Sequence, residues 1–328
     1  MKAIALLSGG LDSRLAIKLM LDQKVDIHAL HFTSIFAPCS DREVEIAEAE
    51  QAAGEFGVPL TVQDITEDLI ALVKSAPHGR GSGVNPCIDC RIMQLRRAKR
   101  LMPEVGAGFV VTGEVRGQRP MSQRHDAMNV IEREAGLEGL LVRPLCARLL
   151  EPTIPEKRDW IDRDRLKRIA GRGRKPQMEL AEELGISDYP APAGGCRLTE
   201  PNYARRMEDL LNHGELNIDN VRLLEVGRHF RLGENTKLVV GREHEENLRI
   251  EELARPDDHI LVARNFPGPT SLGRGQFTDK LLRLAARITA RYGQGKGEDK
   301  VLIDIAGPRH AAPLVRPATD EELERYRL

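Results

Sequence analysis

The stretch AIALLSGGLDSRLAIKLM, residues 3–20, decides how the chain begins to fold. A short apolar run over 3–7 is typical of a buried strand, a glycine-rich turn follows it, and apolar residues then recur at helical spacing over 11–22. In an open parallel sheet such a turn lies at the carboxyl end of its strand, where ligands bind. Glycines let an anion approach the backbone, and unpaired N–H groups at the start of a helix attract it. This stretch therefore predicts a phosphate site.

The first half of the chain continues the same alternation of strand and helix. Strand-like runs at 26–34, 60–65 and 108–113 are separated by amphipathic stretches at 41–56 and 88–102. Strands that alternate with helices of this length are typical of parallel sheets with crossover helices. We therefore predict an α/β fold, a doubly wound parallel sheet.

Changes in sequence pattern divide the chain into three predicted parts. Residues 1–150 form the α/β domain, and residues 151–214 form a helical extension that carries the last cysteine. Residues 215–328 form a smaller C-terminal α+β domain, with strand-like pieces such as 221–232 and a helix at 278–292.

Composition limits the classes of function. The formal charge is −1, so no global field draws the chain to nucleic acid or to an anionic membrane. No apolar stretch approaches the roughly 20 residues that span a bilayer, and no signal peptide opens the chain. We expect a cytoplasmic protein with no membrane partner. Because that compartment keeps thiols reduced, clustered cysteines indicate metal binding or catalysis rather than disulfides.

The glycine-rich turn contains residues suited to a nucleotide. Ser8 and Ser13 add hydroxyl donors to a backbone opened by Gly9 and Gly10. An aspartate in an anion site needs a cation, so Asp12 is assigned to Mg²⁺ carried with the nucleotide. The turn has neither the Gly-Lys-Ser/Thr ending of a Walker A loop nor the G-x-G-x-x-G spacing. The plain alternative is a strand-to-helix turn made of small residues.

Three of the five cysteines form a candidate reactive group. The motif NPCIDC places Cys87 and Cys90 at the start of a helix, where N–H groups favour the thiolate. No second pair at zinc spacing follows, and Cys196 in PAPAGGCRL is the nearest further candidate. Three thiols can hold three irons of a [4Fe-4S] cluster, or can work as a persulfide carrier with a resolving partner, or can be ordinary half-buried residues. Cys39 and Cys146 have no other cysteine nearby in the sequence and are expected to be packing residues.

Together these motifs resemble known families. SGGLDS matches the S-G-G-x-D-S signature of the PP-loop ATP pyrophosphatases, which have the adenine nucleotide alpha hydrolase-like fold. With the C-x-x-C and the third cysteine, the chain is similar to the RNA thiolation branch, the tRNA 4-thiouridine synthetases and tRNA 2-thiouridylases. TGEVRGQRPMSQ, residues 112–123, resembles the T-G-E-x-x-G-Q-x-x-S-Q segment of the former. Residues 226–275 resemble the NFACT-type RNA-binding domain.

The resemblance implies an enzyme that uses ATP and Mg²⁺ to adenylate a pyrimidine carbonyl oxygen in RNA and then replaces that oxygen with sulfur. It implies tRNA rather than ribosomal RNA as substrate, sulfide or a persulfide carrier as sulfur donor, and it is compatible with a homodimer. Asp12 and the three cysteines would be catalytic, and the cysteines would hold the cluster. The nucleotide and substrate site implied by the resemblance comprises Ser8, Gly9, Gly10, Asp12, Ser13, Phe32, Thr33, Ser34, Thr112, Gly113, Glu114, Gln118, Ser122 and Gln123.

Two other functions remain open at the level of sequence. A PP-loop enzyme that amidates a small metabolite would not need the cysteines, and an RNA-binding adaptor with a relict nucleotide domain would not turn over ATP. Residues 215–328 carry 19 Lys and Arg against 19 Asp and Glu, so the net charge of this domain does not attract RNA. Phosphate contacts are expected instead from the basic runs at 91–100 and 157–175.

Overall fold

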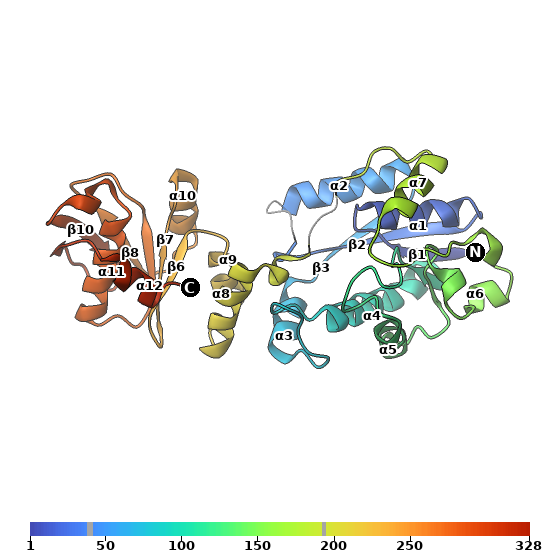
Figure 1. The fold of residues 1–328 in the computed structure, drawn as a ribbon, viewed down its shortest axis with the longest axis horizontal. Coiled ribbons are helices and arrows are strands. Elements are labelled where there is room, and N and C mark those ends of the chain that lie inside the picture. Colours follow the sequence, from blue (N-terminus) through green and yellow to red (C-terminus); the bar gives the residue numbers. More distant parts are fainter. Residues whose placement is uncertain (38–41, 192–194) are drawn as a thin grey trace. The chain divides into compact units, whose positions relative to one another are not determined.

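The computed structural model describes residues 1–37, 42–191 and 195–328, which form two compact units, Met1–Thr199 and Glu200–Leu328 (Figure 1). The boundary differs from the change expected near 215. Residues beyond 150 belong to the first unit because Ile161, Leu166 and Leu180 pack in its core. Cys39 lies outside the described residues.

The first unit is built on a five-stranded parallel sheet with the order β3-β2-β1-β4-β5. The sequence order reverses direction between the neighbours β1 and β4, so the crevice at their carboxyl ends is the switch point where open α/β sheets bind ligands. The strands are β1 (Lys2–Leu6), β2 (Asp26–Thr33), β3 (Leu60–Asp64), β4 (Phe109–Val111) and β5 (Leu141–Val142). The helices are α1 (Leu11–Leu21), α2 (Arg42–Glu55), α3 (Thr66–Ser75), α4 (Cys87–Val105), α5 (His125–Ala135), α6 (Ile154–Lys157) and α7 (Lys175–Glu183).

Two apolar cores cover the two faces of this sheet. Ala3 and Ala5 of β1 face a core with α1 and α7, whereas Ile4 faces a second core with α4 and α5. Figure 1 shows α1, α2 and α7 on one side of the sheet and α3, α4 and α5 on the other. Successive side chains of a strand point to opposite faces, so an all-apolar β1 needs helices on both. The predicted doubly wound α/β fold is confirmed.

The second unit is an antiparallel sheet with the order β11-β10-β8-β9-β7-β6. Helix α11 covers one face of this sheet, and α10 packs on the other. A separate α+β unit at the C-terminus is thus confirmed. Its strands are β6 (Arg228–Gly233), β7 (Thr236–Val240), β8 (His259–Ala263), β9 (Ser271–Gly275), β10 (Val301–Ala306) and β11 (Leu314–Val315), and its helices are α8 (Pro201–Asn212), α9 (Ile218–Leu223), α10 (His244–Glu252), α11 (Asp279–Arg291) and α12 (Asp320–Tyr326).

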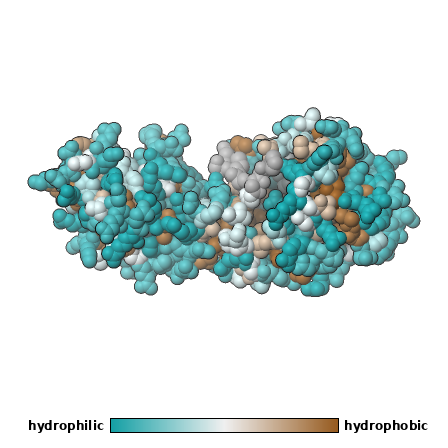
Figure 2. All heavy atoms as spheres, viewed as in Figure 1, coloured by the Kyte–Doolittle hydropathy of each residue, from teal (hydrophilic) through white to brown (hydrophobic). Residues whose placement is uncertain are grey.

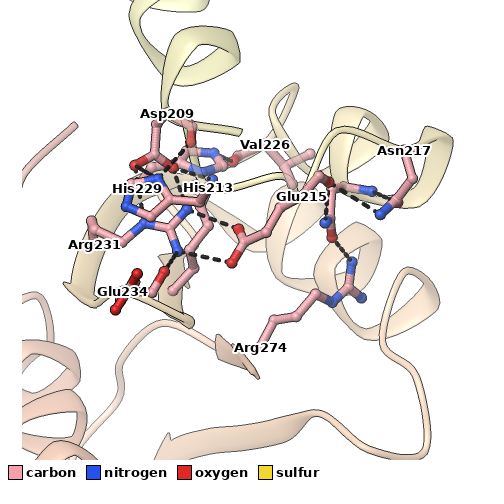
Figure 3. A network of polar contacts seen from close by, with 11 residues as sticks. Asp209, His213, Glu215, Asn217, Val226, His229, Arg231, Glu234 and Arg274 are labelled. Carbon is pink, nitrogen blue, oxygen red and sulfur yellow. Dashed lines mark hydrogen bonds and ion pairs between the residues drawn. The ribbon is translucent and has the colours of Figure 1, made fainter. Parts of the chain in front are cut away.

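A buried ionic network ties α8 to the second sheet (Figure 3). Asp209 of α8 accepts hydrogen bonds from Arg231 Nε and Nη2 of β6 at 3.0 and 2.6 Å, and Lys237 Nζ lies 3.2 Å from the same carboxylate. Arg231 also donates to Glu215, just after α8. Burial raises the pKa of Asp209, but Arg231 and Lys237 together hold it below its ordinary value. This network explains why residues 200–223 fold with the second unit.

In the described part of the chain, no helix has the length and apolar character needed to cross a membrane. One strand expectation is wrong. Residues 221–223 end the helix α9 instead of opening a strand, because Asn217 caps that helix by accepting a hydrogen bond from the Asn220 N–H at 3.0 Å. The strand β6 begins only at Arg228.

Candidate active site

The glycine-rich turn between β1 and α1 has the geometry of an anion site. Gly9 has a φ of +74°, a left-handed conformation that glycine adopts without strain. Gly10 is the N-cap of α1 and supplies no side-chain cap, so the first N–H groups of the helix remain available. Ser13 Oγ donates to the Gly10 carbonyl at 2.8 Å, and the Ser8 N–H donates to Ser13 Oγ at 3.3 Å. These two bonds hold the turn closed; they engage the Ser8 N–H but not the N–H groups at the start of α1.

Arg14 supports the turn from inside the unit. Its guanidinium is buried, its Nε donates to the Gly9 carbonyl at 3.0 Å, and it forms an ion pair with Glu55 of α2. The pairing fixes the left-handed turn from the side opposite to solvent. Sequence analysis did not select Arg14, because a basic residue in the first turn of a helix carries no distinct signal.

Asp12 has one carboxylate oxygen in use and one without a partner. Its Oδ2 accepts a hydrogen bond from Gln118 Nε2 at 2.9 Å, while its Oδ1 is buried and has no hydrogen-bond partner among the residues that the structure describes. A buried oxygen left unpaired costs free energy unless a ligand satisfies it. Carboxylate oxygens suit Mg²⁺, which protein sites often bind through one or two carboxylates and the phosphates of the substrate. The residues present therefore fit a Mg²⁺ ion brought by a nucleotide.

The segment after β4 closes against this turn. Gly113 packs so tightly on the start of α1 that a Cβ there would lie 2.5 Å from the Asp12 carbonyl oxygen and 2.7 Å from Ser13 N. Further along, Gly117 N–H donates to the Gln123 carbonyl at 2.7 Å, and Gln123 Oε1 accepts from Arg119 N–H at 3.0 Å. The structure thus brings together two motifs that lie about a hundred residues apart in the sequence.

Glu114 is held by arginines from two other elements. Arg143 Nε donates to its Oε2 at 3.0 Å, Arg91 Nε lies 3.1 Å from its Oε1, and Thr112 Oγ1 donates to Oε2 at 3.1 Å. Burial alone raises the pKa of Glu114, but Arg91 and Arg143 hold it below its ordinary value. The carboxylate is therefore charged. Since Arg91 directly follows Cys90 in α4, Glu114 connects the segment after β4 to the cysteine motif.

The remaining residues implied by the resemblance have structural partners in this structure. Thr33 Oγ1 donates to Glu45 of α2, and Ser34 Oγ accepts from the Phe36 N–H at 3.3 Å. Phe32 is half-buried against the core shared with α4, and Ser122 is buried. Phe32, Thr33 and Ser34 lie at or just after the end of β2, whereas Ser122 lies between β4 and α5. The predicted contacts of these side chains with a nucleotide or a uridine stay predictions.

Cys87 and Cys90 lie in the first turn of α4, and their environments differ. Asn85 Nδ2 donates to Cys87 Sγ at 3.1 Å. For Cys90, burial raises the pKa to about 12 and outweighs the opposing charge of Arg91. The helix N-terminus was expected to favour the thiolate at both positions. At Cys90, desolvation of the charged form overrides that effect.

Cys196 approaches the motif through backbone bonds. The Arg197 N–H donates to the Phe36 carbonyl at 3.0 Å, and the Val84 N–H donates to the Leu198 carbonyl at 3.1 Å. Burial raises the pKa of Cys196, and the charge of Cys87 raises it further. The effect of one thiol on the pKa of another places the three thiols in one locality. Cys146, by contrast, is fully buried and donates to the Glu114 carbonyl at 3.3 Å.

The thiol group has the donor chemistry of an iron–sulfur site but not the arrangement. Thiolates are the usual ligands of such clusters. Within the ranges that the structure describes, however, no three His, Cys, Asp or Glu side chains are placed so as to hold a metal ion. The structure therefore brings the three predicted cysteines near one another without forming a ligand set.

His78 is a further residue that sequence analysis missed. Its Nδ1 lies 2.7 Å from Asp89 Oδ1, and its Nε2 lies 3.0 Å from Glu134 Oε1. The hydrogen bond to Asp89 raises the pKa of His78 despite the opposing effect of burial. Asp89 is buried between the two cysteines of the motif, so His78 anchors the loop that precedes α4. The aspartate inside C-I-D-C was the available signal.

Comparison with known families identifies both units separately. Residues 1–149 match the family model of the thiamine biosynthesis protein (ThiI), and residues 227–327 match the NFACT protein RNA binding domain. Each match covers less than half of the chain. Both resemblances inferred from the sequence are confirmed.

Curated relatives are tRNA-modifying enzymes. The chain is 32% identical over 128 residues to the tRNA-specific 2-thiouridylase MnmA of Mycobacterium bovis, which covers 34% of each protein. It is 30% identical over 152 residues to the corresponding protein of Mycobacterium ulcerans, with 40% of this chain and 41% of the relative covered. The chain thus spans about a third of the length of the first of these relatives. A crystal structure of a 4-thiouridine synthetase–RNA complex with bound ATP aligns with a TM-score of 0.39 and 23% identity, over 68% of this chain and 52% of that one.

Proposed function

We propose that this chain is an ATP-dependent RNA sulfurtransferase that forms AMP and pyrophosphate and acts on tRNA. One observation carries the proposal. Asp12, with its unpartnered buried oxygen, bonds to Gln118 in the same segment whose Glu114 pairs with Arg91, next to the cysteine motif. A nucleotide site and a thiol group thus share one segment. The family match over residues 1–149 and the tRNA 2-thiouridylase relatives support this assignment.

The first step activates the RNA base. The N–H groups of the Ser8–Ser13 turn bind the phosphates of ATP, and Asp12 Oδ1 would hold Mg²⁺, which supplies charge neutralisation on those phosphates. A pyrimidine carbonyl oxygen attacks the α-phosphorus. The bond from that phosphorus to the oxygen bridging to the β-phosphate breaks, and pyrophosphate leaves. The base carbon then carries adenylate as a leaving group.

The second step exchanges oxygen for sulfur. A sulfur nucleophile forms a bond to the activated carbon, and the carbon–oxygen bond breaks. AMP leaves with the former carbonyl oxygen, and loss of the proton on sulfur leaves a thiocarbonyl. With sulfide as donor no further reactant is needed. The proximity of Cys87, Cys90 and Cys196 supports sulfur delivery at this site, because the charge of one thiol affects the pKa of another.

A persulfide route makes the thiols participants. Cys196 would carry the persulfide, and its terminal sulfur would bond to the activated carbon as AMP leaves, so that the base is joined to Cys196 through an S–S bond. A second thiol then attacks the sulfur of Cys196 in the S–S bond, which leaves a disulfide that a thiol reductant must reduce. Cys87 is better suited than Cys90 to be this resolving thiol, because a pKa of about 12 keeps Cys90 protonated. We also propose a cytoplasmic setting, where such a disulfide would be reduced again.

A cluster is the alternative way to deliver sulfur. Cys87, Cys90 and Cys196 would be the residues that hold a [4Fe-4S] cluster, whose fourth iron would offer an open position for sulfide. Anaerobic purification separates the two routes. A brown, iron-containing protein supports the cluster, and a colourless protein that is active without iron supports the persulfide.

The position of ATP cleavage tests the proposed function. The full chain is incubated with tRNA, sulfide and ATP labelled in the α-phosphate, and AMP is expected to form only when tRNA is present. Asp12→Asn is expected to lower AMP formation at least about a hundredfold, because the metal loses a charged ligand. The matched control is Asp22→Asn at the far end of α1, where the carboxylate pairs with Lys18. Release of ADP, or equal rates with and without tRNA, would contradict the proposal.

A further inference from the structure

A groove on the second unit gathers cations from separate loops. It has a volume of about 660 Å³ and is lined by the turn before α10, the loop between β8 and β9, and the C-terminal end of α11. Glu243 is the single acidic residue in the lining, among the residues that the structure describes. The basic residues of the lining are Arg228, Arg242, His244, Arg291 and Lys296.

Two of these cations are not neutralised by a carboxylate. The Arg228 guanidinium lies over the ring of Tyr292, 4.6 Å from its centroid, and its Nη1 donates to the Gly241 carbonyl at 3.3 Å. An aromatic face holds a guanidinium in place without cancelling its charge. Lys296 is exposed. Neither residue takes part in an ion pair within the described ranges.

The other two arginines pair with carboxylates that differ in exposure, and only Arg291 has a partner that a phosphate can replace. Arg291 Nη2 pairs with Asp320 at 2.8 Å, and 82% of the Asp320 side chain is exposed. Arg242 pairs with Glu246, whose carboxylate is buried and also accepts the Arg242 backbone N–H at 2.8 Å, so this arginine keeps its own partner. An exposed ion pair such as Arg291–Asp320 contributes little, typically below about 1 kcal/mol, so Arg291 can exchange Asp320 for a phosphate at little cost.

The walls of the groove are fixed in place. The Tyr292 hydroxyl accepts a hydrogen bond from Arg327 Nη2 at 3.1 Å, and its ring packs 6.1 Å from that of Phe230. Glycines bring two loops into contact, since a Cβ on Gly293 would lie 3.3 Å from the Pro267 carbonyl oxygen. The cations are therefore held apart in fixed positions rather than on a mobile tail.

We propose that this groove binds the phosphate backbone of RNA. The unit as a whole is electrically balanced, so only a local concentration of charge can attract a polyanion. The face of this unit seen in Figure 2 is largely hydrophilic. The groove itself is lined mainly by charged, polar and glycine residues, which favours nucleic acid over a protein with an apolar interface. The inference rests on the proposed function, since it locates an RNA contact that tRNA thiolation requires. It adds a contact on the second unit to the phosphate contacts expected from the basic runs at 91–100 and 157–175.

The salt dependence of RNA binding tests the groove. Binding of a fluorescein-labelled tRNA transcript to the full chain is measured by anisotropy, without ATP, over a salt series. Each lost phosphate contact is expected to reduce the slope of log K against log salt by about 0.7 to 0.9. Lys296→Gln should therefore reduce the slope by one such step, and Arg228→Gln combined with Lys296→Gln by two.

A matched control variant distinguishes the effect of the groove from a general effect of removing one positive charge. Lys280→Gln removes the same charge from an exposed lysine in the first turn of α11, whereas the groove lies at the other end of that helix. This control should retain the slope of the unmodified chain. Because Lys296 is exposed, Lys296→Gln reports on binding even if the Arg228 variant folds poorly.

The outcomes separate this inference from the proposed function. If Lys296→Gln and a folded double variant both kept the wild-type slope of log K against log salt, the proposed RNA contact of the groove would be wrong, whatever the catalytic activity. An equal reduction of the slope in Lys280→Gln would also contradict the proposed RNA contact. A chain that loses slope as expected but forms no AMP with tRNA would overturn the proposed function and leave the groove in place.

Discussion

Substitution of Gly113 by alanine tests whether the two motifs of the candidate active site depend on each other. The added Cβ would lie 2.5 Å from the Asp12 carbonyl oxygen and 2.7 Å from Ser13 N. Both atoms belong to the backbone at the start of α1, so no side chain can rotate away to make room. The segment after β4 and the start of α1 must therefore move apart.

The cost of this movement follows from the geometry. Extra atoms forced into a packed interior cost about 1–3 kcal/mol. For a unit of this size, about 200 residues, each kcal/mol lowers the melting temperature by about 2–4 °C, so a decrease of about 2–12 °C is expected. ATP cleavage should fall more steeply than stability, because the movement also breaks the Gln118–Asp12 contact at 2.9 Å.

Gly54→Ala is the control for this experiment. Gly54 lies in α2, has no neighbour within 4 Å of the added Cβ, and does not have a positive φ. Alanine there should leave ATP cleavage unchanged and raise stability by up to about 1 kcal/mol. Calorimetry and AMP formation are measured on both variants. If Gly113→Ala melted and cleaved ATP like Gly54→Ala, the packing of the two motifs would not matter and the reasoning would fail.

Further predictions concern charge and thiol chemistry. Asp209→Asn should lower the free energy of unfolding by about 1.5–3 kcal/mol at pH 7. Because the pKa of Asp209 is lowered in the folded chain, its contribution to the free energy of unfolding is present above the unfolded pKa near 3.9 and is lost as the pH falls through the folded pKa. Urea unfolding should therefore show a smaller difference in stability between Asp209→Asn and wild type at pH 3 than at pH 7. An equal difference at both pH values would contradict this. Glu114→Gln should cost about 3–5 kcal/mol, because it removes the partner of a buried arginine; a melting temperature equal to wild type would count against the Glu114 network. In the folded, metal-free chain at pH 8, iodoacetamide should modify Cys87 before Cys90, whose pKa of about 12 leaves about one thiolate in ten thousand; peptide mass spectrometry that finds Cys90 modified first would refute the assignment of the resolving thiol.

The sequence predicted the first unit well because its signals are local. Each strand of the parallel sheet is an apolar run, and a turn or helix follows directly, so period and spacing were enough to indicate the doubly wound fold. The helices α3 and α5 were not predicted, since α3 follows a strand with no strong cap and α5 lies within the stretch considered only as a motif. The end of α9 was mistaken for a strand because its apolar residues have no distinct helical period over one turn.

The candidate site shows where sequence reasoning ends. The turn residues and the thiols could be selected because glycine, aspartate and cysteine have narrow chemical uses. The residues that position them could not, since Arg14, Arg91 and Arg143 are ordinary basic residues until the fold shows their carboxylate partners. The basic groove of the second unit was hidden for the same reason. Its cations come from distant parts of the sequence and cancel in the net charge of the unit.

Mass spectrometry of nucleosides tests the central claim most directly. The full chain is incubated with ATP, tRNA and sulfide, the tRNA is digested, and AMP is counted in the same sample. We predict one thiolated pyrimidine nucleoside for each AMP formed, loss of the thionucleoside in Cys87→Ser, and its retention in Cys146→Ser, whose thiol is fully buried away from the group. AMP without any thionucleoside in the wild type would contradict the account and favour an amidating enzyme. Full thionucleoside formation in Cys87→Ser would contradict the role assigned to the thiols.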